Sequence, residues 1–323
     1  MLATRPALTF ALTSLVVACS PTLPAAPAHA FVPPAPRSPP MELCWIEFSI
    51  NDMPGSYGLA AESEHRTWDI TYSGLLVRHP KGDLLVDAGN SSHFADEIDS
   101  ADFVHRILLR LYPGAGEVVA SAPAALRRAG EEPSRLSAIA LSHVHADHAG
   151  GLLDLPGTPV VVSSDELAFI GQEKDRGGFD VVQAHGRAIE GRARPIRFAR
   201  VPYATFDESF DFFGDGSVVF VPLPGHTPGS MGTFVSPSIG HRFFHVGDAV
   251  NTLEAVEKRR GKSAIMQITD HDGSAADATA ARISQLHDLD GALAILPAHD
   301  RSAWLAAFGA PGRCTGFAGA APR

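Results

Sequence analysis

The chain has 323 residues, of which 45% are hydrophobic and 19% are charged, and its formal net charge is −10. This length and composition suit a globular protein with a substantial core, built as one large domain or two small ones. The excess of acidic side chains, without a run rich in lysine and arginine, disfavours a protein that binds the phosphate backbone of nucleic acids. We therefore expect a small-molecule substrate and no nucleic-acid partner.

The first thirty residues have the pattern of an export signal. Arg5 precedes a short apolar stretch, residues 7–18, which is too short for a membrane-spanning helix. Two processing sites compete: AHA at residues 28–30 fits the Ala-x-Ala rule for cleavage, whereas VVACS at residues 16–20 resembles a bacterial lipoprotein signal cleaved before Cys19. We predict an exported protein without a transmembrane span, either periplasmic or secreted, or alternatively held in the cell envelope by a lipid anchor at Cys19.

The composition divides the chain into four parts: a signal peptide at 1–30, a Pro/Ala-rich linker at 31–41, one domain at 42–311 and a C-terminal tail at 312–323. Besides Cys19, the chain has only Cys44 and Cys314. In an oxidising compartment these two could pair and join the ends of the domain, but two free thiols are an equal alternative.

Strands and helices alternate through the domain. The patterns predict two strands around a turn at 72–89, helices at 94–112 and 122–130, a strand at 136–141, a strand and a helix within 158–171, a hairpin at 210–226, a strand at 240–250, a helix at 277–289 and a strand at 291–300. Residues 172–208 are irregular, and we interpret them as a long insertion or lid-like loop. Together with the hairpin up to residue 213, they are the segment that we expect to select the substrate.

Two further segments have competing interpretations. The aromatic run FDESFDFF at 206–213 favours the core of the hairpin over the lining of a substrate pocket. The arginine-rich segment 185–200 favours a solvated face over an anion-binding surface.

Several predicted strands end in polar side chains that could bind a metal ion. Active sites of layered α/β proteins collect at such strand ends, because side chains from distant parts of the chain meet there. The residues are Asp87, the cluster at 143–148, His226, Asp248 and His299.

The cluster SHVHADH at 142–148 can serve two metal ions. If the chain leaves the strand with a period of two, His143 and His145 point in the same direction. Asp147 and His148 then follow a turn and face a neighbouring point. Imidazole and carboxylate groups are suitable ligands for zinc, manganese or iron.

Four motifs occur in a fixed order: His-x-His-x-Asp-His at 143–148, Pro-Gly-His-Thr-x-Gly at 224–229, Gly-Asp at 247–248 and a final histidine at 299. This order resembles the metallo-β-lactamase superfamily over nearly the whole chain after the linker, about residues 75–299. The resemblance implies an α/β fold, a four-layer αββα sandwich of two sheets covered by helices, with the site at one edge.

The resemblance also implies roles for single residues. One metal ion would be held by His143, His145 and His226, the other by Asp147, His148 and His299, and Asp248 would bridge the two. Asp147 and Asp248 would be the catalytic residues, and Asp87 would orient a ligand histidine from behind. The implied cofactors are two divalent metal ions, with zinc as the leading expectation and iron or manganese as alternatives.

A hydroxide held between two such cations would attack a carbonyl carbon, so the resemblance implies a metal-dependent hydrolase of a small ester, lactone or thioester. Acyl-homoserine-lactone lactonases are the leading comparison, although they often carry a tyrosine just after the bridging aspartate, where this chain offers Asn251 and Thr252. The alternatives are a β-lactam or phosphoester hydrolase, and an iron-dependent oxidoreductase similar to sulfur dioxygenases. Of the remaining histidines, His245 is the one close enough to the motifs to deserve a structural check.

Overall fold

The structure is a computed structural model that describes residues 22–26, 39–59, 62, 65–94, 96–97, 117–173, 182–238 and 241–316. Most of the expected signal peptide and linker, including Cys19, and most of the helix expected at 94–112 lie outside these residues. Among the residues described, no helix is both long enough and apolar enough to span a membrane.

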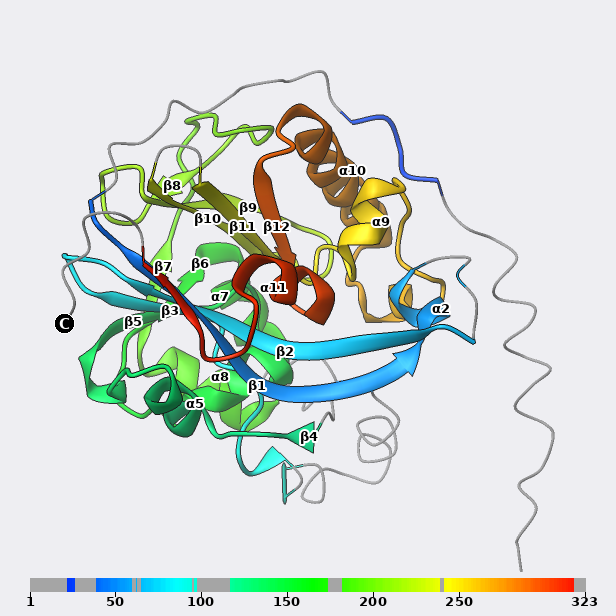
Figure 1. The fold of residues 1–323 in the computed structure, drawn as a ribbon. Coiled ribbons are helices and arrows are strands. Elements are labelled where there is room, and N and C mark those ends of the chain that lie inside the picture. The colour runs from blue at the N-terminus through cyan, green and yellow to red at the C-terminus, as the bar shows by residue number, and fades with distance from the viewer. Residues whose placement is uncertain are drawn as a thin grey trace, which may run out of the picture.

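Two β-sheets form the centre of the molecule (Figure 1). In the larger sheet, the strands follow the order β13 (Cys314–Gly316), β1 (Glu42–Pro54), β2 (Thr67–Arg78), β3 (Asp83–Val86), β5 (Leu136–Ala140), β6 (Val160–Ser163) and β7 (Ala193–Ile196), and β4 (Glu117–Val118) pairs with β1. In the smaller sheet, the order is β12 (Leu293–Pro297), β11 (His241–Gly247), β10 (Met231–Ser238), β9 (Val218–Pro222) and β8 (Phe210–Asp211).

Helices lie on the outer faces of both sheets and at the edge where the site forms. The α-helices are α2 (Gly55–Gly58), α5 (Ala122–Arg128), α6 (Ala146–Ala149), α7 (Ser164–Glu173), α8 (Gln183–Glu190), α9 (Leu253–Glu257), α10 (Gly273–Leu289) and α11 (Arg301–Phe308). The short 3-10 helices are η1 (Pro133–Arg135), η2 (Gly150–Leu152) and η3 (Met266–Thr269).

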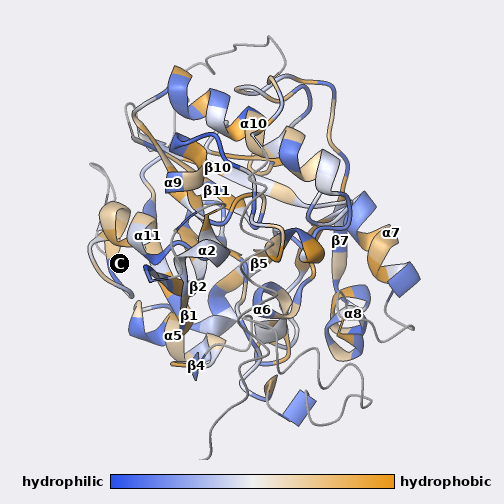
Figure 2. Ribbon diagram, turned by 90° about the vertical axis from the view of Figure 1, so that its right-hand side faces the viewer, coloured by the Kyte–Doolittle hydropathy of each residue, from blue (hydrophilic) through white to orange (hydrophobic). Residues whose placement is uncertain are grey.

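Three apolar clusters hold the layers together. One lies between the sheets and joins inward side chains of β1, β2, β3 and β5 to those of β9, β10 and β11. A second joins the outer face of the larger sheet to α5, α7 and α8, and a third joins the outer face of the smaller sheet to α9 and α10. Figure 2 shows hydrophobic and hydrophilic positions alternating along α10, as expected for a helix with one face on a sheet. The expected four-layer αββα sandwich is confirmed.

The strand directions explain why the polar strand ends meet. β3 and β5 are parallel neighbours, so Asp87 and His143 leave the larger sheet at the same edge. In the smaller sheet β11 and β12 are parallel, and β9 runs the same way because β10 is antiparallel to both β9 and β11. The loops that carry the polar residues of the smaller sheet therefore also start at one edge.

The segment 172–208 differs from its prediction as an insertion or lid-like loop. Within its described part it contains α8 and β7, and β7 pairs in parallel with β6 at the edge of the larger sheet. The sequence pattern does not predict this strand, because an edge strand buries little: only Ile196 of its four residues is buried. Its contribution to the sheet comes from backbone hydrogen bonds, which leave no hydrophobic pattern.

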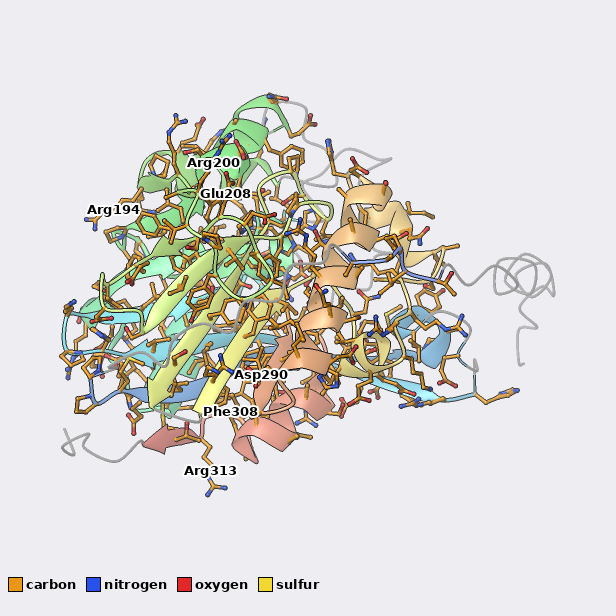
Figure 3. All side chains as sticks on the ribbon, turned by 90° about the horizontal axis from the view of Figure 1, so that it is seen from above. Arg194, Arg200, Glu208, Asp290, Phe308 and Arg313 are labelled. Atoms are coloured by element: carbon orange, nitrogen blue, oxygen red, sulfur yellow. A yellow bond between two sulfur atoms is a disulfide. The ribbon has the colours of Figure 1, made fainter. Side chains whose placement is uncertain are left out.

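The arginines of this region support the fold or face outward. Arg192 donates from its guanidinium to the backbone carbonyls of Leu152, Leu155 and Thr158. Figure 3 shows Arg194 and Arg200 at the periphery of the molecule, with Glu208 beside Arg200. The expected solvated face is therefore the better description of this segment.

The hairpin packs into the core, and the C-terminal end joins the larger sheet. β8 and β9 pair in antiparallel fashion, and Phe210, Phe212 and Phe213 pack against the cluster between the sheets, which confirms the aromatic run as hairpin core. The predicted tail does not begin at residue 312 as a separate part, because β13 adds to the larger sheet beside β1. A disulfide joins Cys44 of β1 to Cys314 of β13, so of the two alternatives the structure contains the pair.

Candidate metal centre

Asp87 follows β3 and lies at the centre of the hydrogen bonds behind the site. Its backbone is in the left-handed region (φ 59°), which aspartate tolerates better than most residues. Its carboxylate accepts from the backbone N–H and the hydroxyl of Ser142, both at 2.7 Å, and from Nδ1 of His148 at 2.8 Å. A proton fixed on Nδ1 leaves Nε2 of His148 free to face the site.

The first group of ligand-type side chains is His143, His145 and His226. Its three ligand atoms lie within 4.8 Å of one another, and all three residues are buried. His143 Nε2 lies 3.1 Å from His145 Nδ1, and the His226 ring stands edge-on to both neighbouring rings.

The second group is Asp147, His148, Asp248 and His299, whose ligand atoms also lie within 4.8 Å of one another. His299 Nε2 lies 3.3 Å from Asp147 Oδ2 and 3.1 Å from Asp248 Oδ1. Nδ1 of His299 donates to the carbonyl of Thr71 at 3.0 Å, which directs Nε2 to the site.

Asp248 reaches both groups. Its Oδ1 lies 3.2 Å from His148 Nε2, and its Oδ2 lies 3.4 Å from His226 Nε2. A carboxylate with one oxygen toward each group has the geometry of a bridge between two cations.

Two glycines allow the loops to approach this closely. Gly225 and Gly247 precede His226 and Asp248 and have φ values of 135° and 52°, which side-chain-bearing residues rarely adopt. A Cβ atom on Gly225 would lie 2.2 Å from the backbone nitrogen of Ala276, at the start of α10. The glycine of each motif is therefore required by the backbone next to the ligand-type residue.

The two groups differ in their protonation. Burial and the neighbouring His226 lower the pKa of His145 to about 3, and burial and His148 lower the pKa of His143. Burial alone would also lower the pKa of His299, but Asp248 and Asp147 outweigh it and raise this pKa to about 10. The pKa of His148 is raised for the same reason, by Asp248 and Asp87 against burial.

Four polar atoms of the cluster are buried and make no hydrogen bond: Nε2 of His148 and His226, and Oδ1 of Asp147 and Asp248. Buried polar atoms normally have partners, because leaving them unsatisfied costs about 1–3 kcal/mol each. Imidazole nitrogens and carboxylate oxygens that converge in this way fit divalent cations of the zinc, iron or manganese type. The residues present therefore fit two cations.

Glu166 of α7 holds two of the loops together from behind. It accepts from Val144 N–H at 2.7 Å, from the Thr227 hydroxyl at 2.7 Å and from Gly229 N–H at 3.1 Å. Val144 lies between His143 and His145, and Thr227 follows His226, so Glu166 fixes the backbone of the first group. Burial raises the pKa of Glu166 to about 7 despite these donors.

Two more charged residues stand behind His226. Asp270 accepts from His226 Nδ1 at 2.8 Å, and Lys262 Nζ lies 2.5 Å from the same Asp270 oxygen. Burial would raise the pKa of Asp270, but Lys262 and His226 outweigh it and lower this pKa.

A small pocket opens beside the second group. It has a volume of about 20 Å³, which is room for about one water molecule. Besides the site residues it is lined by Trp68, Ile70, Tyr72, Asn251, Met266 and Thr269. Trp68 also lines a larger cavity of about 480 Å³ between α2, β2 and α9. None of the residues that line this pocket belongs to the described part of 172–213, so the expectation that this segment selects the substrate stays a prediction.

The structure brings together all seven residues that the sequence proposed as metal ligands and places Asp87 behind His148, as expected. His245 lies under the site with its Nε2 3.8 Å from Asp87, and burial lowers its pKa to about 4. Sequence reasoning missed Glu166, Lys262 and Asp270. Glu166 is one of several polar residues in the first turn of α7, and the other two lie in an irregular segment without a motif.

Comparisons with known proteins agree with this geometry. The family model of the metallo-beta-lactamase superfamily matches residues 66–299. The N-acyl homoserine lactonase AttM of Azorhizobium caulinodans is 26% identical over 188 residues, which are 58% of this chain and 68% of that protein. AttM of Agrobacterium fabrum is 22% identical over 204 residues, 59% of this chain and 70% of that protein.

Solved structures show the same fold. An N-acyl homoserine lactone hydrolase with the product N-hexanoyl-L-homoserine bound at its catalytic metal centre matches with a TM-score of 0.62 and 19% identity, over 83% of this chain and 96% of that chain. AidC, a dizinc quorum-quenching lactonase, matches with a TM-score of 0.57 and 19% identity, over 81% of this chain and 88% of that chain.

Proposed function

The chain belongs to the metallo-beta-lactamase superfamily as a metal-dependent hydrolase, and we propose that it opens small lactones, with N-acyl homoserine lactones as the leading substrate class. The observation that carries the proposal is the pair of ligand groups that share Asp248, beside a small pocket whose lining includes Trp68, Ile70, Tyr72 and Met266. Related small esters and thioesters contain the same electrophilic carbonyl and belong to the same proposal.

We assign the ligands as the geometry groups them. His143, His145 and His226 would hold one divalent cation, Asp147, His148 and His299 would hold the other, and Asp248 would serve both. When bound, two such cations lower the pKa of a water molecule and polarise a carbonyl oxygen. Zinc is the leading assignment, supported by the imidazole-rich donor set.

The chain's own residues orient the donors and manage protons. Asp87 and the Thr71 carbonyl each accept from Nδ1 of a histidine, which leaves Nε2 of His148 and of His299 as the atom that would bind a cation. Hydrolysis of a lactone adds one water molecule: its oxygen bonds to the carbonyl carbon, the ring C–O bond breaks, and a proton from that water must reach the leaving alkoxide. We assign the transfer of this proton to Asp147, whose Oδ1 is buried in the site without a hydrogen bond.

Apolar side chains beside the metal-ligand groups favour a substrate with an apolar part. Trp68, Ile70 and Tyr72 project from one strand, β2, and Met266 faces them from η3. An acyl chain next to the lactone ring would bury apolar surface against these side chains, at about 25 cal/mol for each Å². Trp68 also borders the larger cavity of about 480 Å³, which we propose receives the end of a longer acyl chain.

The test is a substrate screen on purified protein reconstituted with zinc. We expect hydrolysis of N-acyl homoserine lactones, with lower rates on thioesters and simple esters, and loss of all these activities after chelation. A protein that binds two zinc ions but turns over only β-lactams or phosphodiesters would overturn the substrate assignment. Oxygen consumption by an iron-loaded sample, without hydrolysis, would overturn the hydrolase reaction.

We also propose that the protein is exported, either as a periplasmic or secreted form or with a lipid anchor at Cys19. The signal-like N-terminus supports export, and so does the disulfide between Cys44 and Cys314, since such bonds persist mainly in oxidising compartments. Mass spectrometry of the mature N-terminus distinguishes the two forms: a chain beginning at Phe31 supports the soluble form, and a diacylated Cys19 supports the anchored one. A chain that retains Met1 would overturn export.

A further inference from the structure

A buried ion pair stands behind one histidine of the metal centre and has no counterpart in the motifs. Lys262 and Asp270 lie in the segment between α9 and α10, and their side chains are only 6% and 1% exposed. A buried ion pair contributes little to stability on average, because both charges lose their hydration. The position of this ion pair next to His226 therefore indicates a role other than stability.

Three groups converge on one carboxylate oxygen. Asp270 Oδ1 lies 2.8 Å from His226 Nδ1 and 2.5 Å from Lys262 Nζ. The ammonium and the imidazole nitrogen are 3.2 Å apart. If His226 binds a cation through Nε2, Nδ1 carries the proton and donates to Asp270, so the short distance between the two nitrogens follows from their shared acceptor.

The carboxylate behind the second group is different. Asp87 faces Ser142, His148 and, at 3.8 Å, His245. No lysine or arginine contacts Asp87 among the hydrogen bonds and ion pairs of the described residues, whereas Lys262 offsets the charge of Asp270. A carboxylate that accepts from a ligand imidazole increases the electron donation of that imidazole to the metal. An ammonium on the same carboxylate opposes this effect.

From this contrast we propose that Asp270 and Lys262 are positioning residues for His226. Asp270 fixes the Nδ1–H tautomer of His226, and Lys262 weakens the electron donation of this imidazole to the metal. The cation at His143, His145 and His226 therefore stays electrophilic and exchanges more easily than the cation of the second group. The inference rests on the proposed function and adds a cause for a difference in affinity between the two metal ions. It also gives the irregular segment before α10 a part in the site.

The test compares stepwise metal affinities in the full-length protein, with zinc and cobalt(II) titrated against a competing chelator. In Asp270→Asn we expect the affinity for one ion to fall by about 10- to 100-fold, the usual effect of removing such a partner. In Asp87→Asn we expect the affinity for the other ion to fall instead. Asp277→Asn is the matched control, because this carboxylate lines the same cavity as Lys262 and Asp270 but, among the hydrogen bonds and ion pairs of the described residues, makes none with His226.

Lys262→Gln separates positioning from a purely structural pair, since glutamine can still donate to Asp270 but carries no charge. We expect this variant to bind the same ion several-fold more tightly and to turn over more slowly at unchanged KM. A salt bridge that merely holds the segment would instead weaken both ions together and lower the stability of the metal-free protein.

A direct readout is the NMR signal of the His226 Nδ1–H proton in the metal-loaded protein. It should be present in wild type and in Lys262→Gln, and lost or exchange-broadened in Asp270→Ala. Wild type that binds two ions while all variants keep both affinities within about twofold would overturn this inference and leave the proposed function intact. Wild type that binds no metal would overturn the proposed function itself.

Discussion

The group of His143, His145 and His226 and the group of Asp147, His148 and His299 lie side by side but carry charge differently. In the first, burial and mutual repulsion keep His143 and His145 neutral near pH 7. In the second, carboxylates hold protons on His148 and His299. The first group can therefore accept a cation directly, whereas the second group must first release protons.

The largest expected effect removes the residue common to both groups. Asp248→Ala should lower kcat/KM by at least about a thousandfold, because the bridge and its charge are lost to both cations. Metal content by mass spectrometry and lactone turnover check this, with Asp165→Asn on the exposed side of α7 as the control. Full activity with both metals retained in Asp248→Ala would refute the bridge.

A change in only one group should sharpen the comparison. Asp147→Asn should weaken one stepwise metal affinity by more than about 100-fold, above the usual effect of a supporting partner, and leave the other nearly unchanged. The measurement is the same chelator competition as above. Equal loss of both ions would mean that the two groups do not act as separate sites.

The protonation difference predicts a pH dependence. Protons on His148 and His299 must leave before a cation binds, so the affinity for the second ion should rise with pH between 6 and 8, by about tenfold per pH unit for each proton displaced. The affinity for the first ion should change little over this range, because the pKa of His145 lies at about 3. Titrations at several pH values with proton-release calorimetry test this, and parallel slopes for both ions would contradict it.

The smallest expected effect concerns the support of the first group. The pKa of Glu166 is raised by burial from 4.5 to about 7, so the unfolded chain ionises more readily than the folded one. The free energy of unfolding should therefore fall by up to about 3 kcal/mol as pH rises from 4.5 to 7. Glu166→Gln should be less stable at low pH and should lack this decline, which urea unfolding of both proteins at pH 4.5 and 7 would measure; an identical decline in the variant would contradict it.

Several features were predictable because they leave local patterns. Buried strands such as β5 and β6 are apolar along their length, and the ligand-type residues follow strands in short motifs with glycine at the turn. Edge strand β7 was not predictable, because only one of its residues is buried and its pairing partner is β6, some thirty residues earlier in the chain.

The residues that contact the ligand histidines from outside the site also include one that the sequence predicts and two that it does not. Asp87 stands after a strand and was expected to support a ligand, and it does contact His148. Lys262 and Asp270 lie in a segment with no motif and no regular spacing, and only the close approach of that segment to the His226 loop gives them a role.

The sequence by itself predicted alternating strands and helices with ligand-type residues at strand ends, because strand periodicity and turn-forming glycine are local properties of the chain. The four-layer fold and the set of seven ligands were implied by the resemblance of the four ordered motifs to the metallo-β-lactamase superfamily. Only the tertiary structure decided which carboxylate supports which histidine, that Cys44 meets Cys314, and that β2 and the segment before α10 wall the pocket. These are contacts between segments far apart in the chain, and their free energies depend on distance and burial, which exist only after folding.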